Sequence, residues 1–399
     1  MKPQSLLVLG ATGTIGVNTL DVVARHPGRF SVYGLAAGAN IDLLFKQACV
    51  HQPAIVVICD ATAFQKWHDN GYDNRLFQAL GYQPEVVGSG ELAQLCASPE
   101  VDTVVAAIVG AAGLKPTLSA LKAGKKVLLA NKESLVLAGQ FMINACKESG
   151  ATILPVDSEH NAIYQCLPQN FDVARADSFG IERLILTASG GPFRKASLQD
   201  LQKVTPAQAV AHPNWVMGRK ISVDSATMAN KGLELIEALW MFGLPANQLS
   251  VLIHPQSIVH SLVEYMDGSL LAQLGCPDMR TPIAHVLGLP DRISSGSPRL
   301  NLAQLAHLDF EDPDLSRFPM LGLAFKVLEN PDTLAPVFNA ANEVAVDLFL
   351  REKIAFMDIV RMTEACLSKF AGRPISTLDD AFALDSEVRS HAFQLTEKF

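Results

Sequence analysis

The chain has 399 residues, more than one hydrophobic core usually spans, so two or three domains are expected. Apolar residues make up 49% and charged residues 18%, which excludes a disordered chain and predicts large buried cores. The formal net charge of −8 argues against a nucleic-acid-binding protein, which needs a basic face, whereas an acidic enzyme can bind an anionic substrate through a local cluster of cations.

The seven cysteines lack the close spacing of a zinc or redox motif, which predicts free thiols in a reducing compartment. The N-terminal residues lead directly into a short apolar strand, which does not fit a secretory signal. The longest apolar run, near residues 104–114, is shorter than the ~20 residues of a membrane helix. We therefore expect a cytoplasmic protein with neither a membrane nor a nucleic acid as partner.

Residues 1–150 alternate short apolar runs with helical patterns, which is typical of a Rossmann-like α/β domain with a parallel sheet covered by helices on both faces. Such runs are continuously apolar because strands buried on both faces carry few polar residues. Strands are expected at residues 6–9, 30–37, 55–58, 103–107 and 127–129.

Residues 151–290 have longer, more amphipathic strands and predict a central α+β catalytic domain with an open sheet. Its strands are expected at residues 151–156, 184–187, 249–253, 259–265 and 270–273. A Ser-Ser-Gly-Ser-Pro run marks a linker over residues 291–311. Residues 312–399 show apolar stripes at helical spacing and predict a C-terminal helical bundle, with helices at residues 320–329, 335–350, 356–370 and 378–398.

A glycine-rich turn, Gly10 to Gly16, follows the first predicted strand and opens a helix. This context is typical of a dinucleotide site, in which backbone N–H groups approach a pyrophosphate at the helix N-terminus; the alternative is a turn without a ligand. The second predicted strand ends in Gly38, Ala39 and Asn40, without the acid that binds the ribose of NAD. The sequence therefore favours NADP, although no Arg or Lys is present there to bind its 2′-phosphate.

Two acidic residues follow a predicted strand at Asp157 and Glu159. In an extended chain, residues two apart point to the same side, so both carboxylates are predicted to face one point. Two carboxylates with open coordination positions suit Mg²⁺ or Mn²⁺. The alternative is a polar turn that caps a helix.

A second polar segment predicts a helix that begins near Ser225. Asn230, Lys231 and Glu234 share one face of this helix because they are three or four residues apart. Glu234 is a candidate third metal ligand, and Asn230 and Lys231 are candidates to hold a phosphate or hydroxyl. The alternative is an ordinary Lys–Glu surface pair.

Three further segments are ambiguous. Ser189-Gly190-Gly191 after a strand forms either an anion-binding nest or only a turn. Residues 212–218 form either a mobile lid or a structural loop. Lys132 follows a strand at the ligand-binding edge of the parallel sheet, where it either contacts substrate or cofactor or caps a loop.

These motifs together resemble the 1-deoxy-D-xylulose 5-phosphate reductoisomerase family in order along nearly the whole chain. The motifs are GATGTIG at 10–16, ANKES at 130–134, PVDSEHNAI at 155–163, TASGGPF at 187–193, HPNWVMGRKISVDSATMANKGLE at 212–234, HPQSIVH at 254–260, PDMRTPIAH at 277–285 and NAANE at 339–343. The resemblance implies a three-domain homodimer that uses NADPH and Mn²⁺ or Mg²⁺. The reaction it implies is rearrangement and reduction of a sugar phosphate, 1-deoxy-D-xylulose 5-phosphate, to 2-C-methyl-D-erythritol 4-phosphate in the non-mevalonate isoprenoid pathway.

The same resemblance implies roles for individual residues. The metal ligands would be Asp157, Glu159 and Glu234. The substrate would be held by Lys132, Ser158, Glu159, Ser189, His212, Ser225, Asn230, Lys231 and Glu234. Within these two sets, the catalytic residues would be Lys132, Asp157, Glu159, His212 and Glu234. NADPH would contact Thr12, Gly13, Thr14, Ile15, Gly38, Ala39, Asn40, Asn131, Glu133 and Gly218. One departure is Ala39, where some relatives carry a basic residue.

Two other functions fit part of these features. A semialdehyde dehydrogenase shares the glycine-rich opening but needs a nucleophilic cysteine, and no cysteine here lies in a convincing nucleophile turn. An NADPH-binding redox sensor would not need the carboxylate and lysine residues.

Overall fold

The computed structural model describes residues 2–211 and 218–398. The chain divides into two compact units, each assembled from separate stretches of sequence. Unit 1 comprises Met1–Ser134, Met142–Asn161 and Asp278–Pro298, and unit 2 comprises Leu135–Phe141, Ala162–Pro277 and Arg299–Phe399.

Unit 1 is built on a parallel sheet of seven strands, counted over the residues that the structure describes, in the order β4-β3-β2-β1-β5-β6-β7. The strands are β1 (Gln4–Leu9), β2 (Phe30–Ala37), β3 (Ile55–Ile58), β4 (Glu85–Gly88), β5 (Thr103–Ala106), β6 (Lys126–Leu129) and β7 (Thr152–Pro155). β1 lies at the centre and its apolar residues are buried, as expected for a strand covered on both faces. The predicted Rossmann-like sheet is confirmed.

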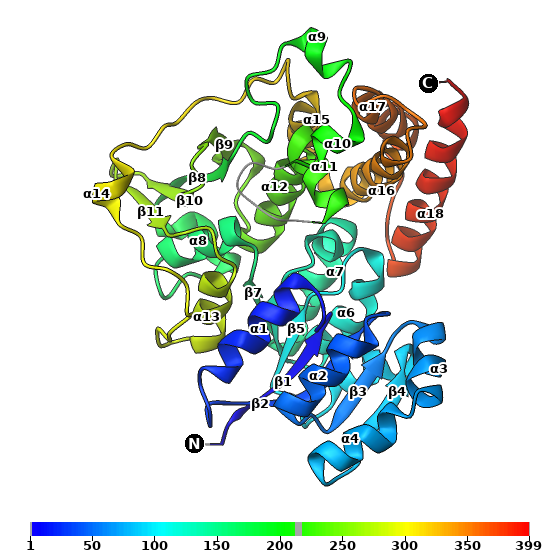
Figure 1. The fold of residues 1–399 in the computed structure, drawn as a ribbon. Helices are drawn as coiled ribbons and strands as arrows, with labels where there is room; N and C mark the ends of the chain where they lie inside the picture. Colours follow the sequence, from blue (N-terminus) through cyan, green and yellow to red (C-terminus); the bar gives the residue numbers. More distant parts are fainter. Residues whose placement is uncertain (1, 212–217, 399) are drawn as a thin grey trace. The chain divides into compact units, whose positions relative to one another are not determined.

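Successive strands run outward from β1 through β2 and β3 to β4, and then outward on its other side from β5 to β7. Because parallel crossovers are right-handed, this reversal places helices on both faces of the sheet (Figure 1). The helices of this part of the chain are α1 (Thr14–Ala24), α2 (Ile41–His51), α3 (Ala61–Asp69), α4 (Tyr72–Leu80), α5 (Leu92–Ala97), α6 (Leu114–Lys122), α7 (Lys132–Ser149) and α8 (Ser158–Cys166). Of these, α7 and α8 contribute residues to both units. The reversal also creates the crevice position at which such sheets bind ligands, beside the carboxyl ends of β1 and β5.

A distant stretch of sequence completes unit 1. Helix α13 (Arg280–Gly288) packs against α1. Arg280 binds Asp278 at 2.6 Å and Asp21 of α1 at 3.2 Å, and Arg29 binds Asp291 at 2.9 Å. These ion pairs fix the returning segment against the first βαβ unit.

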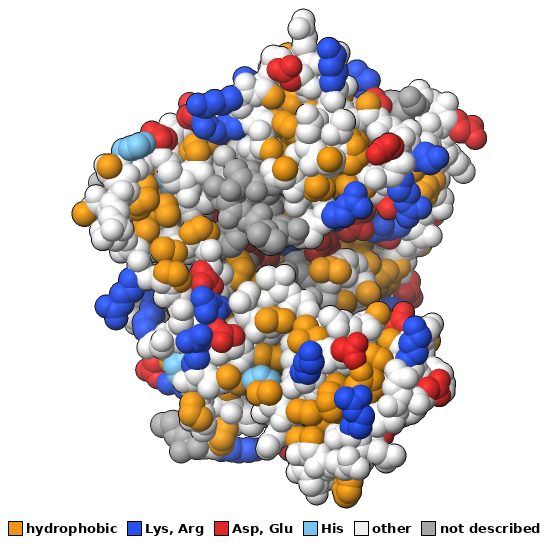
Figure 2. Space-filling model, viewed as in Figure 1, with side chains coloured by type: hydrophobic (Ala, Val, Ile, Leu, Met, Phe, Trp, Pro, Cys, Tyr) orange, Lys and Arg blue, Asp and Glu red, His pale blue; other side chains and the backbone are white. Residues whose placement is uncertain are grey.

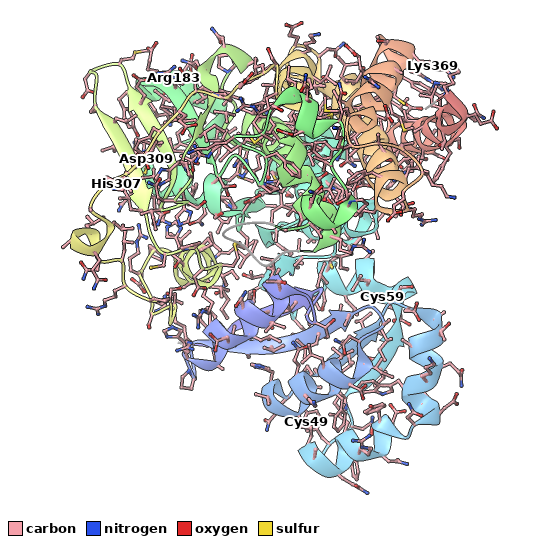
Figure 3. All side chains as sticks on the ribbon, turned by 45° about the horizontal axis from the view of Figure 1, so that its top comes forward. Cys49, Cys59, Arg183, His307, Asp309 and Lys369 are labelled. Carbon is pink, nitrogen blue, oxygen red and sulfur yellow. The ribbon has the colours of Figure 1, made fainter. Side chains whose placement is uncertain are left out.

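Unit 2 contains a mixed four-stranded sheet in the order β11-β10-β8-β9, counted over described residues. β8 (Ile181–Ala188) pairs parallel with β9 (Leu249–Ile253) and antiparallel with β10 (Val259–Tyr265), which pairs antiparallel with β11 (Leu270–Leu274). Arg183 of β8, labelled in Figure 3, forms a cross-strand ion pair with Glu264 of β10 at 2.6 Å. The predicted open sheet is therefore observed with four of its five expected strands, and β8 starts three residues earlier than expected. The fifth, expected at residues 151–156, is instead β7 of the parallel sheet in unit 1, because it pairs with β6.

The helices of unit 2 include the predicted helical tail, in which α16 packs against both α17 and α18 (Figure 1). They are α9 (Leu198–Leu201), α10 (Pro206–Ala209), α11 (Arg219–Thr227), α12 (Ala229–Phe242), α14 (Leu302–Leu305), α15 (Pro319–Val327), α16 (Pro331–Leu350), α17 (Asp358–Phe370) and α18 (Leu378–Leu395). Helix α16 starts earlier than predicted, with Pro331 in its first turn and Pro336 also inside it. The first-turn position suits proline because the N–H that it lacks has no partner there.

The seven cysteines are free thiols, and Cys49 and Cys59 are labelled in Figure 3 within unit 1. Among the described residues, no helix is both long and apolar enough to cross a bilayer.

His285 on α13 generates a prediction about stability and pH. Burial, together with the nearby Arg292 charge, lowers the pKa of His285 from 6.5 to about 4. The unfolded chain therefore takes up a proton below pH 6.5 that the folded protein does not, so this contribution to stability is present above pH 6.5 and is lost as the pH falls toward 4. Between pH 7 and pH 5, the free energy of unfolding should fall by about 2 kcal/mol more in the wild type than in His285→Gln.

Denaturant titrations of both proteins at each pH measure this difference. The exposed His307→Gln serves as the matched control and should keep the wild-type pH dependence. Equal pH dependence in the wild type and His285→Gln would contradict the assignment.

Candidate active site

The glycine-rich turn lies between the carboxyl end of β1 and the start of α1, as predicted. Gly10 has φ +77°, and a Cβ there would lie 2.5 Å from the carbonyl oxygen of Ala107, so only glycine fits. A Cβ on Gly16 would collide with the backbone of Gly10 and Ala11. Thr12 to Ile15 are at least partly exposed at the helix N-terminus. This is the geometry in which backbone N–H groups can receive a pyrophosphate.

The other predicted cofactor residues of unit 1 lie after strands of the same parallel sheet. Gly38, Ala39 and Asn40 are exposed after β2, and the Asn40 side chain caps α2 by accepting from Leu43 N–H at 3.2 Å. Asn131 after β6 is buried; it caps α7 and donates to the carbonyl groups of Ile108 and Gly110. Its side chain therefore holds two loops together. Glu133 follows in the first turn of α7, whereas the predicted cofactor residue Gly218 is the N-cap of α11 in unit 2.

Lys132 and Asp157 meet at the carboxyl ends of adjacent strands. β6 pairs with β7, Lys132 begins α7 after β6, and Asp157 follows β7. The Lys132 Nζ forms an ion pair with Asp157, and the lysine is buried. Burial of a lysine is costly even when a carboxylate pairs with it. Capping a loop therefore does not by itself explain why Lys132 is buried at the ligand-binding edge of the sheet.

The predicted extended geometry of Asp157 and Glu159 is wrong. Helix α8 begins at Ser158, and the backbone carbonyl of Asp157 accepts from Asn161 N–H at 2.9 Å, so Glu159 lies in the first helical turn. The helix N-terminus favours acidic residues at these positions, which overrides the two-residue periodicity of a strand. Ser158 Oγ donates to Glu159 Oε2 at 2.6 Å. The predicted metal and substrate residues of this segment are therefore adjacent, and the helix sets the direction of their side chains.

The second predicted segment is divided between two helices. The expected single helix starting near Ser225 is wrong, because Met228 adopts a left-handed conformation with φ +64° and separates α11 from α12. Ser225 thus lies in the last turns of α11, whereas Asn230, Lys231 and Glu234 share a face of α12. A left-handed conformation is uncommon for a residue other than glycine, and the sequence gives no signal for it.

Glu234 is the most buried acid of the predicted site, at 1% exposed. It accepts from the side-chain amide of Asn230 and forms an ion pair with Lys231, which is 4% exposed. The surface-pair alternative is therefore wrong: these charges are out of water, where an ionised carboxylate needs compensating donors.

The Ser-Gly-Gly turn after β8 packs directly on α11. Gly191 has φ +64°, and a Cβ there would lie 2.7 Å from the carbonyl oxygen of Ser225. Ser189 Oγ accepts from Gly191 N–H at 3.2 Å. Within unit 2, the structure therefore brings the turn that carries Ser189 to the helix that carries Ser225. The predicted His212 and most of the 212–218 lid lie outside the described residues.

One set of residues was missed by the sequence reasoning. Asp224 on α11 is buried and accepts from Asn342 of the NAANE motif, although the motif had been given no role. No local pattern could have indicated this pair, because its members are 118 residues apart.

A glycine-rich phosphate loop on a doubly wound parallel sheet, accompanied by buried carboxylate–lysine pairs, defines a nucleotide-dependent enzyme of the Rossmann-like α/β class. Family profiles then match most of the chain. They are 1-deoxy-D-xylulose 5-phosphate reductoisomerase over residues 6–139, its C-terminal domain over residues 153–242, and the DXP reductoisomerase C-terminal domain over residues 274–391. The chain belongs to the 1-deoxy-D-xylulose 5-phosphate reductoisomerase family, which confirms the resemblance.

Relatives of the same name support this over their full length. The reductoisomerase of Laribacter hongkongensis is 53% identical over 389 residues, covering 97% of this chain and 98% of the relative. That of Methylobacillus flagellatus is 51% identical, covering 98% and 97%.

Solved structures agree with the sequence relatives. A DOX-P reductoisomerase in complex with NADPH, fosmidomycin and magnesium has a TM-score of 0.90 and 45% identity, covering 99% of this chain and 98% of the other. The Zymomonas mobilis enzyme in complex with NADPH has a TM-score of 0.90 and 44% identity, covering 100% and 99%. Membership of this family decides against both the semialdehyde dehydrogenase and the redox sensor.

Gly191→Ala tests the contact between the Ser-Gly-Gly turn and α11. The methyl group should push the turn away from Ser225 and raise the KM for the sugar phosphate at least tenfold, while the KM for NADPH changes little. Steady-state kinetics with each substrate varied in turn measure both values. Gly180→Ala is the matched control, since Gly180 has φ +65° but no atom within 4 Å of the added Cβ. Equal effects of both substitutions would show that backbone strain, and not the contact, is responsible.

Proposed function

We propose residue roles for the reaction that defines this family. The chain is an NADPH- and divalent-metal-dependent oxidoreductase that converts 1-deoxy-D-xylulose 5-phosphate to 2-C-methyl-D-erythritol 4-phosphate. The observation that carries the proposal is the buried Lys231–Glu234 pair on α12. This helix directly follows α11, which contacts the Ser-Gly-Gly turn. The product is a precursor of isoprenoids, and the chain acts in the non-mevalonate pathway.

Asp157, Glu159 and Glu234 bind the divalent ion, either Mg²⁺ or Mn²⁺. Carboxylate oxygens are the ligands that such hard cations prefer, and each of the three acids already accepts from a neighbouring donor, which fixes its orientation. When bound, the ion supplies Lewis-acid stabilisation of the negative charge that develops on substrate oxygens as the carbon skeleton rearranges. Lys132 beside Asp157 and Lys231 beside Glu234 compensate these two carboxylates for the water that burial removes.

The substrate phosphate binds in unit 2 at Ser189, Ser225, Asn230 and Lys231. Hydroxyl groups, an amide and an ammonium group can donate hydrogen bonds to a phosphate. The backbone contact of Gly191 with Ser225 keeps the turn and α11 together. Anchoring the phosphate positions the reacting carbons without itself performing chemistry. Ser158, Lys132 and His212 contact the rest of the substrate.

NADPH supplies the hydride. Its pyrophosphate binds at Thr12, Gly13, Thr14 and Ile15, and its 2′-phosphate lies near Gly38, Ala39 and Asn40. No acid stands at these three positions to repel that phosphate, which supports NADPH over NADH. The remaining cofactor contacts are Asn131, Glu133 and Gly218.

The chain is organised as an NADPH-binding domain over residues 1–150, a catalytic and dimerising domain over residues 151–290, a linker over residues 291–311 and a helical domain over residues 312–399. It acts in the cytoplasm without nucleic-acid or membrane partners. The dimer forms through the edge strand β11, where Leu270 and Leu271 are about half exposed, and through Met266 in the turn before it, which is 67% exposed. Hydrophobic side chains gather over β10 and β11 in Figure 2, and an exposed apolar edge strand invites pairing.

A direct spectrophotometric assay tests the function. Purified protein with 1-deoxy-D-xylulose 5-phosphate, Mn²⁺ or Mg²⁺ and NADPH should oxidise NADPH, which lowers the nicotinamide absorbance, and a chelator should stop the reaction. Consumption that continues in excess chelator would overturn the metal-dependent function.

Glu234→Gln tests the proposed metal ligand. Removing one ligand charge should lower kcat by at least a hundredfold while leaving NADPH binding, measured by fluorescence titration, within about twofold of the wild type. Glu182→Gln, at an exposed position on β8, is the matched control. Near-normal turnover of Glu234→Gln at saturating metal would reject the role.

Leu271→Glu tests the dimer. A charge on β11 should convert the protein to a monomer in size-exclusion chromatography with light scattering, because an unpaired charge is costly at an apolar interface. Leu198→Glu on α9, which is also about half exposed, should remain dimeric. A dimeric Leu271→Glu would place the interface elsewhere.

A further inference from the structure

A buried polar network ties α11 to the C-terminal helices of unit 2. Asp224 is 1% exposed, and Asn342 of α16 is fully buried. Asn342 Nδ2 donates to Asp224 Oδ1 at 2.8 Å, and Lys220 Nζ binds Asp224 Oδ2 at 2.9 Å. Both oxygens of this buried carboxylate are therefore occupied.

The network continues into the last long helix. Glu343, next to Asn342, binds Arg389 of α18 at 2.6 Å and lies 4.0 Å from Lys220. Arg389 also binds Asp385 at 2.7 Å. Burial alone would lower the pKa of Arg389, but the bond to Asp385 and the Glu343 charge outweigh it and raise the pKa. The charges thus run without interruption from α11 through α16 to α18, which pack in that order (Figure 1).

Stability alone gives little reason for this arrangement. Replacing a buried ionic group by apolar residues of similar volume is often neutral or stabilising, so a buried carboxylate between α11 and α16 is better explained by the orientation that it imposes. The Asn342 hydrogen bond to Asp224 and the approach of Lys220 to Glu343 link α11 to α16 at two points one turn apart, which limits rotation of α11 about its axis.

Helix α11 has two different neighbours. Asp224 faces α16, whereas the backbone at the next residue, Ser225, contacts Gly191 of the Ser-Gly-Gly turn. The helix is therefore clamped between the C-terminal helices and the turn that carries Ser189. A small rotation of α11 would change where the Ser225 hydroxyl points relative to Ser189.

We propose that Asn342 and Asp224 are positioning residues that set the geometry of the phosphate subsite through α11, with Glu343 supporting them through Lys220 and Arg389. This inference rests on the proposed phosphate role of Ser189 and Ser225. The proposal gives the NAANE motif of the helical tail a function in substrate affinity, although the motif is not among the proposed substrate or cofactor residues.

Asn342→Asp and the exchanged double variant Asp224→Asn/Asn342→Asp test the proposal. The single variant places two carboxylates together and should raise the KM for the sugar phosphate at least tenfold, with the KM for NADPH within twofold of the wild type. The double variant restores an amide–carboxylate bond with the partners reversed and should recover most of that loss. Asn330→Asp, exposed before the same helix, should behave as the wild type.

A purely structural role predicts a different result. It would lower the melting temperature and the active fraction while leaving both KM values unchanged, and that outcome would overturn the proposal. If Asn342→Asp does not fold, Glu343→Gln carries the test, with an expected threefold to tenfold rise in the same KM; an unchanged value would likewise overturn it.

Ser225→Ala separates this inference from the function on which it rests. If Ser225→Ala raises the KM for the sugar phosphate but Asn342→Asp does not, the phosphate subsite stands and the positioning role is wrong. If Ser225→Ala leaves that KM unchanged, the phosphate assignment of Ser225 is wrong, and the positioning role is overturned with it.

Discussion

The cost of removing an ionised carboxylate from water is the constraint on which the site depends. Burial of an unpaired carboxylate is unfavourable by several kcal/mol, so each acid must be accompanied by donors. Here Lys132 accompanies Asp157 in unit 1, and Lys231 accompanies Glu234 in unit 2. The same pairing that makes the acids tolerable inside the protein also fixes the direction of their oxygens, which is the property that a metal ligand requires. Stability and chemistry therefore impose the same arrangement.

The sequence predicted those features that short-range physics determines. Apolar runs of four residues, such as Ile55–Ile58, are strands because they are buried on both faces of a parallel sheet. Gly10 marks the nucleotide loop because no other residue accepts both its φ and the approach of Ala107. The helical spacing of apolar residues predicted the C-terminal helices, and the amphipathic strands predicted the central sheet. Family resemblance supplied the residue roles, which local patterns alone left open.

The failures have equally physical causes. The sequence pattern predicts an extended chain at Glu159, but an acidic residue next to a helix start is stabilised by the helix dipole, and the segment folds as α8. Met228 divides two helices through a left-handed conformation that its side chain does not favour, so only tertiary packing can impose it. The strand β4, flanked by short polar helices, lacks the apolar run that identified its neighbours, since its residues are mostly half-buried or exposed.

Long-range contacts were beyond any pattern in the sequence, and they decide how the site is held. The segment from Asp278 to Pro298 joins unit 1 through ion pairs with residues more than 250 positions earlier. Asn342 reaches Asp224 in the same manner within unit 2. A nine-residue helix such as α11 is too short to be stable alone, so its orientation must come from what it packs against. The C-terminal helices hold α11 on one side and the Ser-Gly-Gly turn contacts it on the other, so under the proposed roles of Ser189 and Ser225 these helices belong to the active-site architecture.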